Sequence, residues 1–166
     1  MDYLEFAQDV VNTALNAGAH EAEVYIQTGS EFHVQVRMGD IESLTQASFK
    51  GLGLRVFVDK RMGFSSTTDL DPDVLTDMAK TTVQLAKSAS RDRFNGLPEV
   101  GQGVAPHLDL YDPKVLEIPA ERKIEMAKEA EKAAFDFDPR IKNSEGASVS
   151  TYEGTRIIAN SNGILY

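Results

Sequence analysis

The sequence predicts an α+β fold: an antiparallel meander sheet with flanking helices, followed by a second, smaller helix-plus-hairpin unit. Apolar residues recur at helical intervals near the N-terminus, alternate with polar ones from residue 22 to residue 67, and return to helical intervals from residue 72. The breaks within the alternating region are short, which suits hairpins rather than the longer crossovers of a parallel sheet. This order of segments favours α+β over α/β.

The first predicted element is an amphipathic helix that begins after Asp2. Asp2 and Glu5 have the spacing of a capping box, which satisfies free backbone N–H groups at a helix start. Gly18 supplies the stop, because glycine adopts the left-handed conformation that commonly ends a helix. The apolar positions of this helix are Leu4, Ala7, Val11, Ala14 and Leu15.

Three alternating stretches then predict strands that pair antiparallel. Their expected buried residues are Ala22, Val24 and Ile26, then Phe32, Val34 and Val36, and then Leu54, Val56 and Val58. Glycine and polar residues predict breaks between strands at residues 28–30, 38–40 and 59–63.

Gly51 and Gly53 raise the question of a phosphate-binding loop. Such a loop needs its glycines after a strand and at the start of a helix, where free N–H groups meet the phosphate. Here the two glycines precede the strand at residues 54–58, so the order is reversed. A bulge or a close approach between backbones is the better interpretation.

A second helix is predicted from Asp71, as its cap, and Pro72, as its first residue, to about Ser90. Its apolar stripe is Leu75, Met78, Ala79, Thr82, Leu85 and Ala86. A further helix is predicted from Pro119 to Asp138. Its expected buried stripe is Ile124, Ala127, Ala130, Ala134 and Phe137.

Strand signals return near the C-terminus, at residues 147–150 and 155–159, around a turn at 152–154. Asn162-Gly163 is a strong hairpin signal, because both residues tolerate positive φ, but only three residues follow it. We therefore expect the strand that carries Ile157 and Ile158 to have an unpaired edge.

These patterns predict three regions along the chain. They are an N-terminal α+β unit over residues 1–90, a Gly- and Pro-rich linker over 91–118, and over 119–166 the start of a second α+β unit, truncated at its C-terminus.

Composition narrows the classes of function. The chain has 166 residues and a formal net charge of −9, whereas nucleic-acid binding depends on clustered Lys and Arg. It has no cysteine, which excludes disulfides and thiolate metal sites. Its acidic N-terminus is unlike a secretory signal, and no apolar run approaches the roughly 20 residues of a membrane span. We expect a cytoplasmic protein with neither nucleic acid nor membrane as a partner.

No complete catalytic or metal-binding set is apparent among the polar residues. His20-Glu21 begins like the zinc motif H-E-x-x-H, but Val24 stands where the second histidine is required. His33 is predicted to face outward and His107 to lie in the linker, with no orienting partner for either. The sequence therefore predicts no catalytic residue and no metal ligand.

The polar stretch 65–68 has two interpretations. It does not fit the G-x-S-x-G nucleophile motif, so it is either a strand end that faces a substrate or a loop that caps the helix starting at Pro72. Asp69 and Asp71 lack the spacing of a calcium loop and fit the capping role better.

Six segments in collinear order resemble the TldD/PmbA family. Those similar to its N-terminal region are AEV at 22–24, VRMGDIES at 36–43, GLGLRVF at 51–57 and GFSSTTDL at 63–70. Those similar to its middle region are NSEGA at 143–147 and ANSNG at 159–163. The resemblance covers nearly the whole chain. The amino-acid sequence at residues 65–70 and 108–113 is more similar to the PmbA/TldE type than to the TldD type.

The resemblance implies a function. Members are called modulators of DNA gyrase or TldD/TldE metallopeptidases, and the pair is thought to process peptides as a cytoplasmic heterodimer. Their zinc motif, H-E-x-x-x-H, belongs to the TldD type and lies beyond the region matched here. The resemblance therefore implies an N-terminal segment of a TldE/PmbA-like subunit of a two-component zinc peptidase acting on peptides or unfolded proteins. We expect no cofactor in this chain, no activity of the chain alone, and zinc only in a TldD-type partner.

The expected partners are a TldD-type subunit or another copy of the chain, and a peptide substrate. Arg55, Ser65, Ser66 and Thr67 are the residues expected to face the peptide or partner. The alternative is a non-enzymatic peptide-binding or scaffold domain that acts by β-strand addition.

Overall fold

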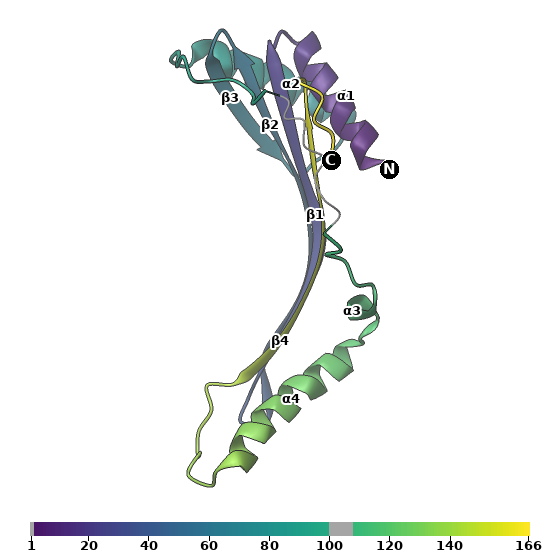
Figure 1. The fold of residues 1–166 in the computed structure, drawn as a ribbon, viewed down its shortest axis with the longest axis vertical. Helices are drawn as coiled ribbons and strands as arrows, with labels where there is room; N and C mark the ends of the chain where they lie inside the picture. Colours follow the sequence, from purple (N-terminus) through teal and green to yellow (C-terminus); the bar gives the residue numbers. More distant parts are fainter. Residues whose placement is uncertain (1, 100–107) are drawn as a thin grey trace. The chain divides into compact units, whose positions relative to one another are not determined.

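The computed structural model describes residues 2–99 and 108–166, so that His107 and part of the predicted linker lie outside it. Its elements, in chain order, are α1 (Tyr3–Asn16), β1 (Glu21–Arg37), β2 (Asp40–Val58), β3 (Arg61–Thr67), α2 (Pro72–Ser88), α3 (Lys114–Glu117), α4 (Ala120–Phe137) and β4 (Ala147–Asn160). The strands form an antiparallel sheet in the order β3-β2-β1-β4, with helices alongside it (Figure 1). The predicted α+β class is confirmed.

The chain forms two compact units, each built from separate segments. Unit 1 consists of Met1–Thr28, Phe49–Ala105 and Thr155–Tyr166, and unit 2 of Gly29–Ser48 and Pro106–Gly154. Strands β1, β2 and β4 are long enough to contribute residues to both units. The units therefore interleave along the chain, whereas the sequence pattern predicts contiguous regions.

The helices of unit 1 begin where the sequence predicts, because their caps are local. The Asp2 side chain accepts hydrogen bonds from the N–H groups of Leu4 and Glu5, and Asp71 accepts one from Asp73. Two predicted stripe positions are wrong, since Leu4 and Leu85 are exposed. The buried residues of the two helices are Ala7, Val10, Val11 and Ala14 in α1, and Leu75, Ala79, Thr82, Val83 and Ala86 in α2.

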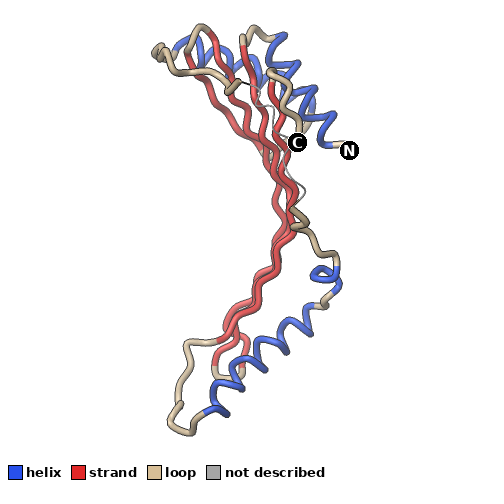
Figure 2. Tube along the Cα trace, viewed as in Figure 1, coloured by secondary structure: helices blue, strands red, loops and turns tan. Residues whose placement is uncertain are grey.

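Helices α1 and α2 lie on the same side of the unit 1 sheet (Figure 2) and contact each other. They pack on its inward side chains, which are Ala22, Val24 and Ile26 of β1, Leu52, Leu54, Val56 and Val58 of β2, and Ile157 and Ala159 of β4. All of these are buried, as the alternation predicts for the side chains of one sheet face. The opposite face of this sheet carries no helix among the described residues.

Helix α2 packs closest on β3 at Gly63, which is buried. A Cβ atom added there would lie 2.8 Å from the Ala86 backbone nitrogen and closer still to the Thr82 carbonyl oxygen. Only a hydrogen atom fits between this strand and the helix. The predicted close backbone approach therefore exists, but at Gly63, because an added Cβ at Gly53 would meet the Phe64 ring.

Two tight turns join the first three strands. Met38-Gly39 and Asp59-Lys60 have positive φ at both central positions, as a type I′ hairpin turn requires. The break predicted at 38–40 is confirmed at residues 38–39, since β2 begins at Asp40. The break predicted at 59–63 is only two residues long, since β3 begins at Arg61.

Two other predicted breaks are wrong. Residues 28–30 lie inside β1 and residues 152–154 inside β4, both of which are continuous. The hairpin of unit 2 is therefore the β1–β2 hairpin, and β4 enters the unit as a single strand. Glycine and polar residues are tolerated within these strands, because pairing with neighbours decides whether a strand continues.

Unit 2 has a small core between α4 and the strands. It consists of Phe32, Val34, Val36 and Ala127, with Ala120, Ile124 and Val149 packed against it. The predicted stripe of α4 is wrong at Ala130, Ala134 and Phe137, which are exposed. The buried positions of α4 are Lys123, Ala127 and Glu131, four residues apart.

The C-terminal segment pairs with β4, contrary to the expected unpaired edge. The chain reverses after Asn160, and Ile158 and Tyr166 exchange backbone hydrogen bonds of 2.8 and 2.9 Å. A further bridge joins Ala159 to Leu165. The predicted reversal at Asn162-Gly163 is confirmed, although of these two residues only Gly163 has a positive φ. Three residues are enough to return along the edge of β4.

Candidate functional site

The helix-free face of the unit 1 sheet, called here the open face, carries several exposed apolar side chains. Its residues, from β1, β2 and β3, include Glu23, Tyr25, Gln27, Gly51, Gly53, Arg55, Met62, Phe64 and Ser66. Tyr25 is 36% exposed and Phe64 is 57% exposed, although neighbouring residues on the same strands are buried. Large exposed apolar side chains that gather on one sheet face are typical of a binding surface.

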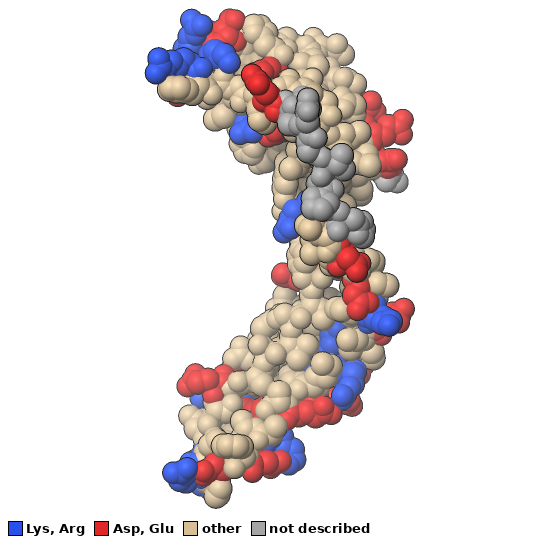
Figure 3. Space-filling view, viewed as in Figure 1, with Lys and Arg blue, Asp and Glu red and all other residues tan. Residues whose placement is uncertain are grey.

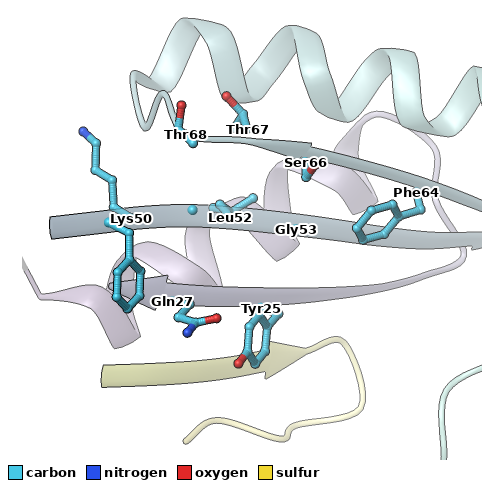
Figure 4. Close-up of a pocket in the computed structure, with 11 residues that line it drawn as sticks. Tyr25, Gln27, Lys50, Leu52, Gly53, Phe64, Ser66, Thr67 and Thr68 are labelled. Atoms are coloured by element: carbon cyan, nitrogen blue, oxygen red, sulfur yellow. The ribbon is translucent and has the colours of Figure 1, made fainter. Parts of the chain in front are cut away.

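A groove of 740 Å³ lies on the open face (Figure 4). Tyr25 and Gln27 of β1 line it together with Phe64 and Ser66 of β3. Between these two strands, residues 49–53 of β2 form the floor of the groove. Gly51 and Gly53 place no side chain in it. A neighbouring pocket of 490 Å³ shares Tyr25, Gly53 and Phe64 and adds Glu23, Arg55 and Met62. The depression can therefore accept an elongated ligand.

Arg55 places a positive charge on the open face, and the Glu23 carboxylate neutralises it. Its guanidinium forms an ion pair with Glu23 and lies 5.6 Å from the centre of the Phe57 ring. The Arg55 side chain remains 40% exposed, so its remaining N–H groups can still donate to a ligand carbonyl.

The four residues expected to face a ligand divide between two environments. Arg55 and Ser66 line the pockets of the open face. Ser65 is turned toward α2, where its hydroxyl and that of Thr82 form a 2.9 Å hydrogen bond. Thr67 lies at the rim of the groove, and its hydroxyl oxygen accepts a 3.0 Å hydrogen bond from the Asp69 N–H.

The loop interpretation of the polar stretch is wrong, because Ser65, Ser66 and Thr67 belong to β3 and α2 is capped by Asp71. The capping role expected of Asp69 and Asp71 is confirmed, because Asp71 caps α2 and its own N–H donates to the Asp69 carboxylate. Ser66 alternates to the other face and borders the groove. Sequence reasoning missed Tyr25 and Phe64, whose signal is an aromatic side chain at an outward position of an alternating strand.

The two described histidines have ordinary surface roles. His20 Nδ1 lies 3.6 Å from the Asp59 carboxylate, and His33 Nδ1 lies 2.9 Å from the Ser150 hydroxyl. Within residues 2–99 and 108–166, no three or more His, Cys, Asp or Glu side chains gather where they would hold a metal ion. None of the helices in the same residues has the length and apolar character to cross a bilayer.

Charged side chains form local pairs on the surface. Figure 3 shows basic side chains in small groups with acidic ones nearby. On α4, Arg122 pairs with Glu125 and Glu129, and Lys132 pairs with Asp136. Such exposed pairs add little to stability.

Glu131 is a buried carboxylate that joins α4 to the β1–β2 hairpin in unit 2. Its two oxygens accept hydrogen bonds of 2.8 Å from the N–H groups of Met38 and Gly39. Burial acts to raise the pKa of Glu131, but the donors at Gly39, Ser144 and Met38, with the nearby Arg37 charge, outweigh it and lower the pKa below its ordinary value of 4.5.

Glu131→Gln is expected to destabilise unit 2 at neutral pH, because an amide accepts only one of the two N–H groups well. A folded-state pKa below the unfolded value contributes stability above the unfolded pKa, which is lost as pH falls through the folded pKa. The stability difference between wild type and Glu131→Gln should therefore shrink as pH falls below 4.5. Urea unfolding across this range measures it, and a difference independent of pH would contradict the role.

Known protein families match the chain in both its N-terminal and its C-terminal part. Residues 22–86 match the first domain of the PmbA/TldA metallopeptidases, and residues 113–166 match their central domain. The Metalloprotease PmbA of Escherichia coli O157:H7 is 32% identical over 163 residues, covering 95% of this chain and 36% of that protein. A PmbA homologue of Haemophilus influenzae is 33% identical over 157 residues, covering 93% and 34%. The chain thus spans about a third of the length of these curated relatives.

Solved structures agree with these matches. A candidate modulator of DNA gyrase from Bacteroides thetaiotaomicron superimposes with a TM-score of 0.88 at 30% identity, covering 100% of this chain and 38% of that one. TldE from Thermococcus kodakarensis has the same fold, with a TM-score of 0.81 at 18% identity, covering 97% and 36%.

Proposed function

Because the chain belongs to the PmbA/TldA metallopeptidase family, we propose that it is the peptide-binding part of a TldE/PmbA-like subunit in a two-component zinc metallopeptidase. The catalytic zinc belongs to a TldD-type partner, and the chain alone is inactive. The family resemblance supports this division of roles. The proposed setting is the cytoplasm, and the proposed substrates are peptides or unfolded proteins.

The groove on the open face is the observation that carries the peptide-binding role. An extended peptide has a side chain about every 3.3 Å and needs a long, shallow site rather than a closed pocket. The groove offers aromatic contacts at Tyr25 and Phe64, and at Gly51 and Gly53 a stretch of backbone free of side chains. Apolar contacts of this kind fit the exposed hydrophobic side chains of unfolded chains.

Gly51→Leu is expected to weaken the binding of an unstructured peptide by about tenfold or more, because the new side chain occupies the groove. An added Cβ at Gly51 meets nothing nearer than the Thr67 carbonyl oxygen at 3.9 Å, so the fold accepts the substitution. Fluorescence anisotropy with a labelled apolar peptide measures the affinity. The matched control is Gln84→Leu, which adds the same side chain to an exposed position of α2. Equal affinity of both variants and the wild type would contradict the groove as the binding site.

Strand addition is the second candidate function, and the position of β3 favours it. β3 is an edge strand of the sheet, so its outer backbone groups are available for a peptide to pair with. A peptide methylated on alternate backbone nitrogens distinguishes the two modes. Binding that survives methylation supports the groove, whereas binding that is lost supports strand addition.

A further inference from the structure

Unit 2 has its own cavity, of 300 Å³, at the start of α4. Phe32 and Thr151 line it from the strands, and Ile118, Ala120 and Lys123 line it from the α4 end. None of these residues belongs to the groove of unit 1. What this cavity binds is therefore independent of the function proposed above.

Lys123 places a buried positive charge in this cavity. The residue is 7% exposed, and its ammonium donates a 2.9 Å hydrogen bond to the Thr151 hydroxyl and lies 4.9 Å from the centre of the Phe32 ring. No carboxylate of the described chain lies within ion-pair distance of it. An ammonium has three N–H donors, and a buried charge is stable when it is paired. The cavity therefore holds a cation with capacity for an anionic partner.

The backbone of α4 adds a partial positive charge on the side of the cavity where Lys123 lies. Its N-cap residue, Pro119, has no side chain that can accept from the first N–H groups of the helix, and no side-chain cap replaces it. Ile118 and Ala120, on either side of this cap, line the cavity. The partial positive charge of a helix start and the Lys123 ammonium thus act on the same space.

The acidic residues of the cavity limit the charge of what it can bind. Glu31 and Glu153 also line it, so an anion is attracted only beside Lys123, and the two glutamates repel a dianion more strongly than a monoanion. We propose that the cavity binds a single carboxylate group, either the C-terminus of a peptide or an acidic side chain. Lys123, with Thr151 beside it, is the residue that pairs with this carboxylate.

The test uses three probes of matched size with the whole chain, observed by amide chemical shifts in NMR titrations. They are acetyl-alanyl-alanine with a free carboxylate, the same peptide as its amide, and acetyl-glutamate as its amide. The free acid is expected to bind at least about tenfold more tightly than its amide, with shifts at Ala120, Lys123 and Thr151. If the glutamate probe binds like the free acid, an acidic side chain is a competent source, and if it does not, the site takes a peptide C-terminus.

Two variants and one further ligand complete the test. Lys123→Met keeps the side-chain length and is expected to abolish the preference for the acid, whereas Lys128→Met, at an exposed position of the same helix, should keep it. Equal binding of acid and amide to the wild type overturns the proposal whether or not Lys123→Met folds. Tighter binding of inorganic phosphate than of the free acid, or shifts confined to other residues, overturns it as well.

Discussion

Gly63→Ala is expected to lower the free energy of unfolding by about 3 kcal/mol, since overpacking costs most where the neighbours cannot move. The new methyl group would contact the Thr82 carbonyl and the Ala86 nitrogen, which are backbone atoms of α2. Relief requires the helix to move away from β3, which exposes Leu75, Ala79 and Val83. Urea unfolding followed by circular dichroism measures the loss, and amide exchange in α2 locates it.

Gly51→Ala provides the matched control for this prediction. It makes the same chemical change in the same sheet, but its methyl group meets only one atom, at an ordinary contact distance of 3.9 Å. Its effect should stay within about 0.5 kcal/mol. If the two variants were equally stable, the close packing of α2 on β3 would not limit stability.

Gly146→Ala is expected to lower the stability of unit 2 by about 2 kcal/mol, because two costs combine. Gly146 has a φ of +104°, a conformation that a side chain strains, and an added Cβ would lie 2.7 Å from the Val36 carbonyl oxygen. This glycine lies directly before β4, where the chain joins the strands of unit 2. The measurement is the denaturant midpoint, with amide exchange of Val34 and Val36 as the local readout.

Gly163→Ala separates the cost of the positive φ from the cost of the steric contact. Gly163 has a similar φ of +92°, but an added Cβ there would meet nothing within 4 Å. It should therefore show the conformational cost alone, about 1 kcal/mol. Equal losses for the two variants would mean that the contact with Val36 costs nothing.

Features that depend on neighbouring residues could be predicted from the sequence. The caps at Asp2 and Asp71 and the turn at Met38-Gly39 each involve a few adjacent residues, and each is where the pattern places it. The alternation of Leu52, Leu54 and Val56 identifies the buried face of β2 for the same reason.

Features set by distant contacts could not be predicted. The buried residues of α4 have the helical spacing of four, but two of them, Lys123 and Glu131, are charged. They can be buried because Lys123 donates a hydrogen bond to Thr151 and Glu131 accepts hydrogen bonds from the β1–β2 hairpin. A search for apolar spacing therefore selects the face with Ala130 and Phe137, which is exposed.

The candidate site was predicted in part. Arg55 and Ser66 could be assigned to the open face from alternation, while Ser65 required knowledge of α2, since its partner Thr82 is 17 residues away. Tyr25 and Phe64 lie on different strands, so only the strand order brings them to the same groove.

The pairing of β4 with β1 has a consequence for the newborn chain. The Ala22 N–H donates to the Ser161 hydroxyl across 139 residues, and β4 follows β1 only after more than a hundred others. At a synthesis rate of about 10 residues per second, β4 is synthesised roughly 10 s after β1, and the edge of β1 stays unpaired for that time. During that time its unpaired N–H and C=O groups are a template for strands of other nascent chains. Closure of this edge, once β4 has left the ribosome, is therefore a step at which productive folding competes with aggregation.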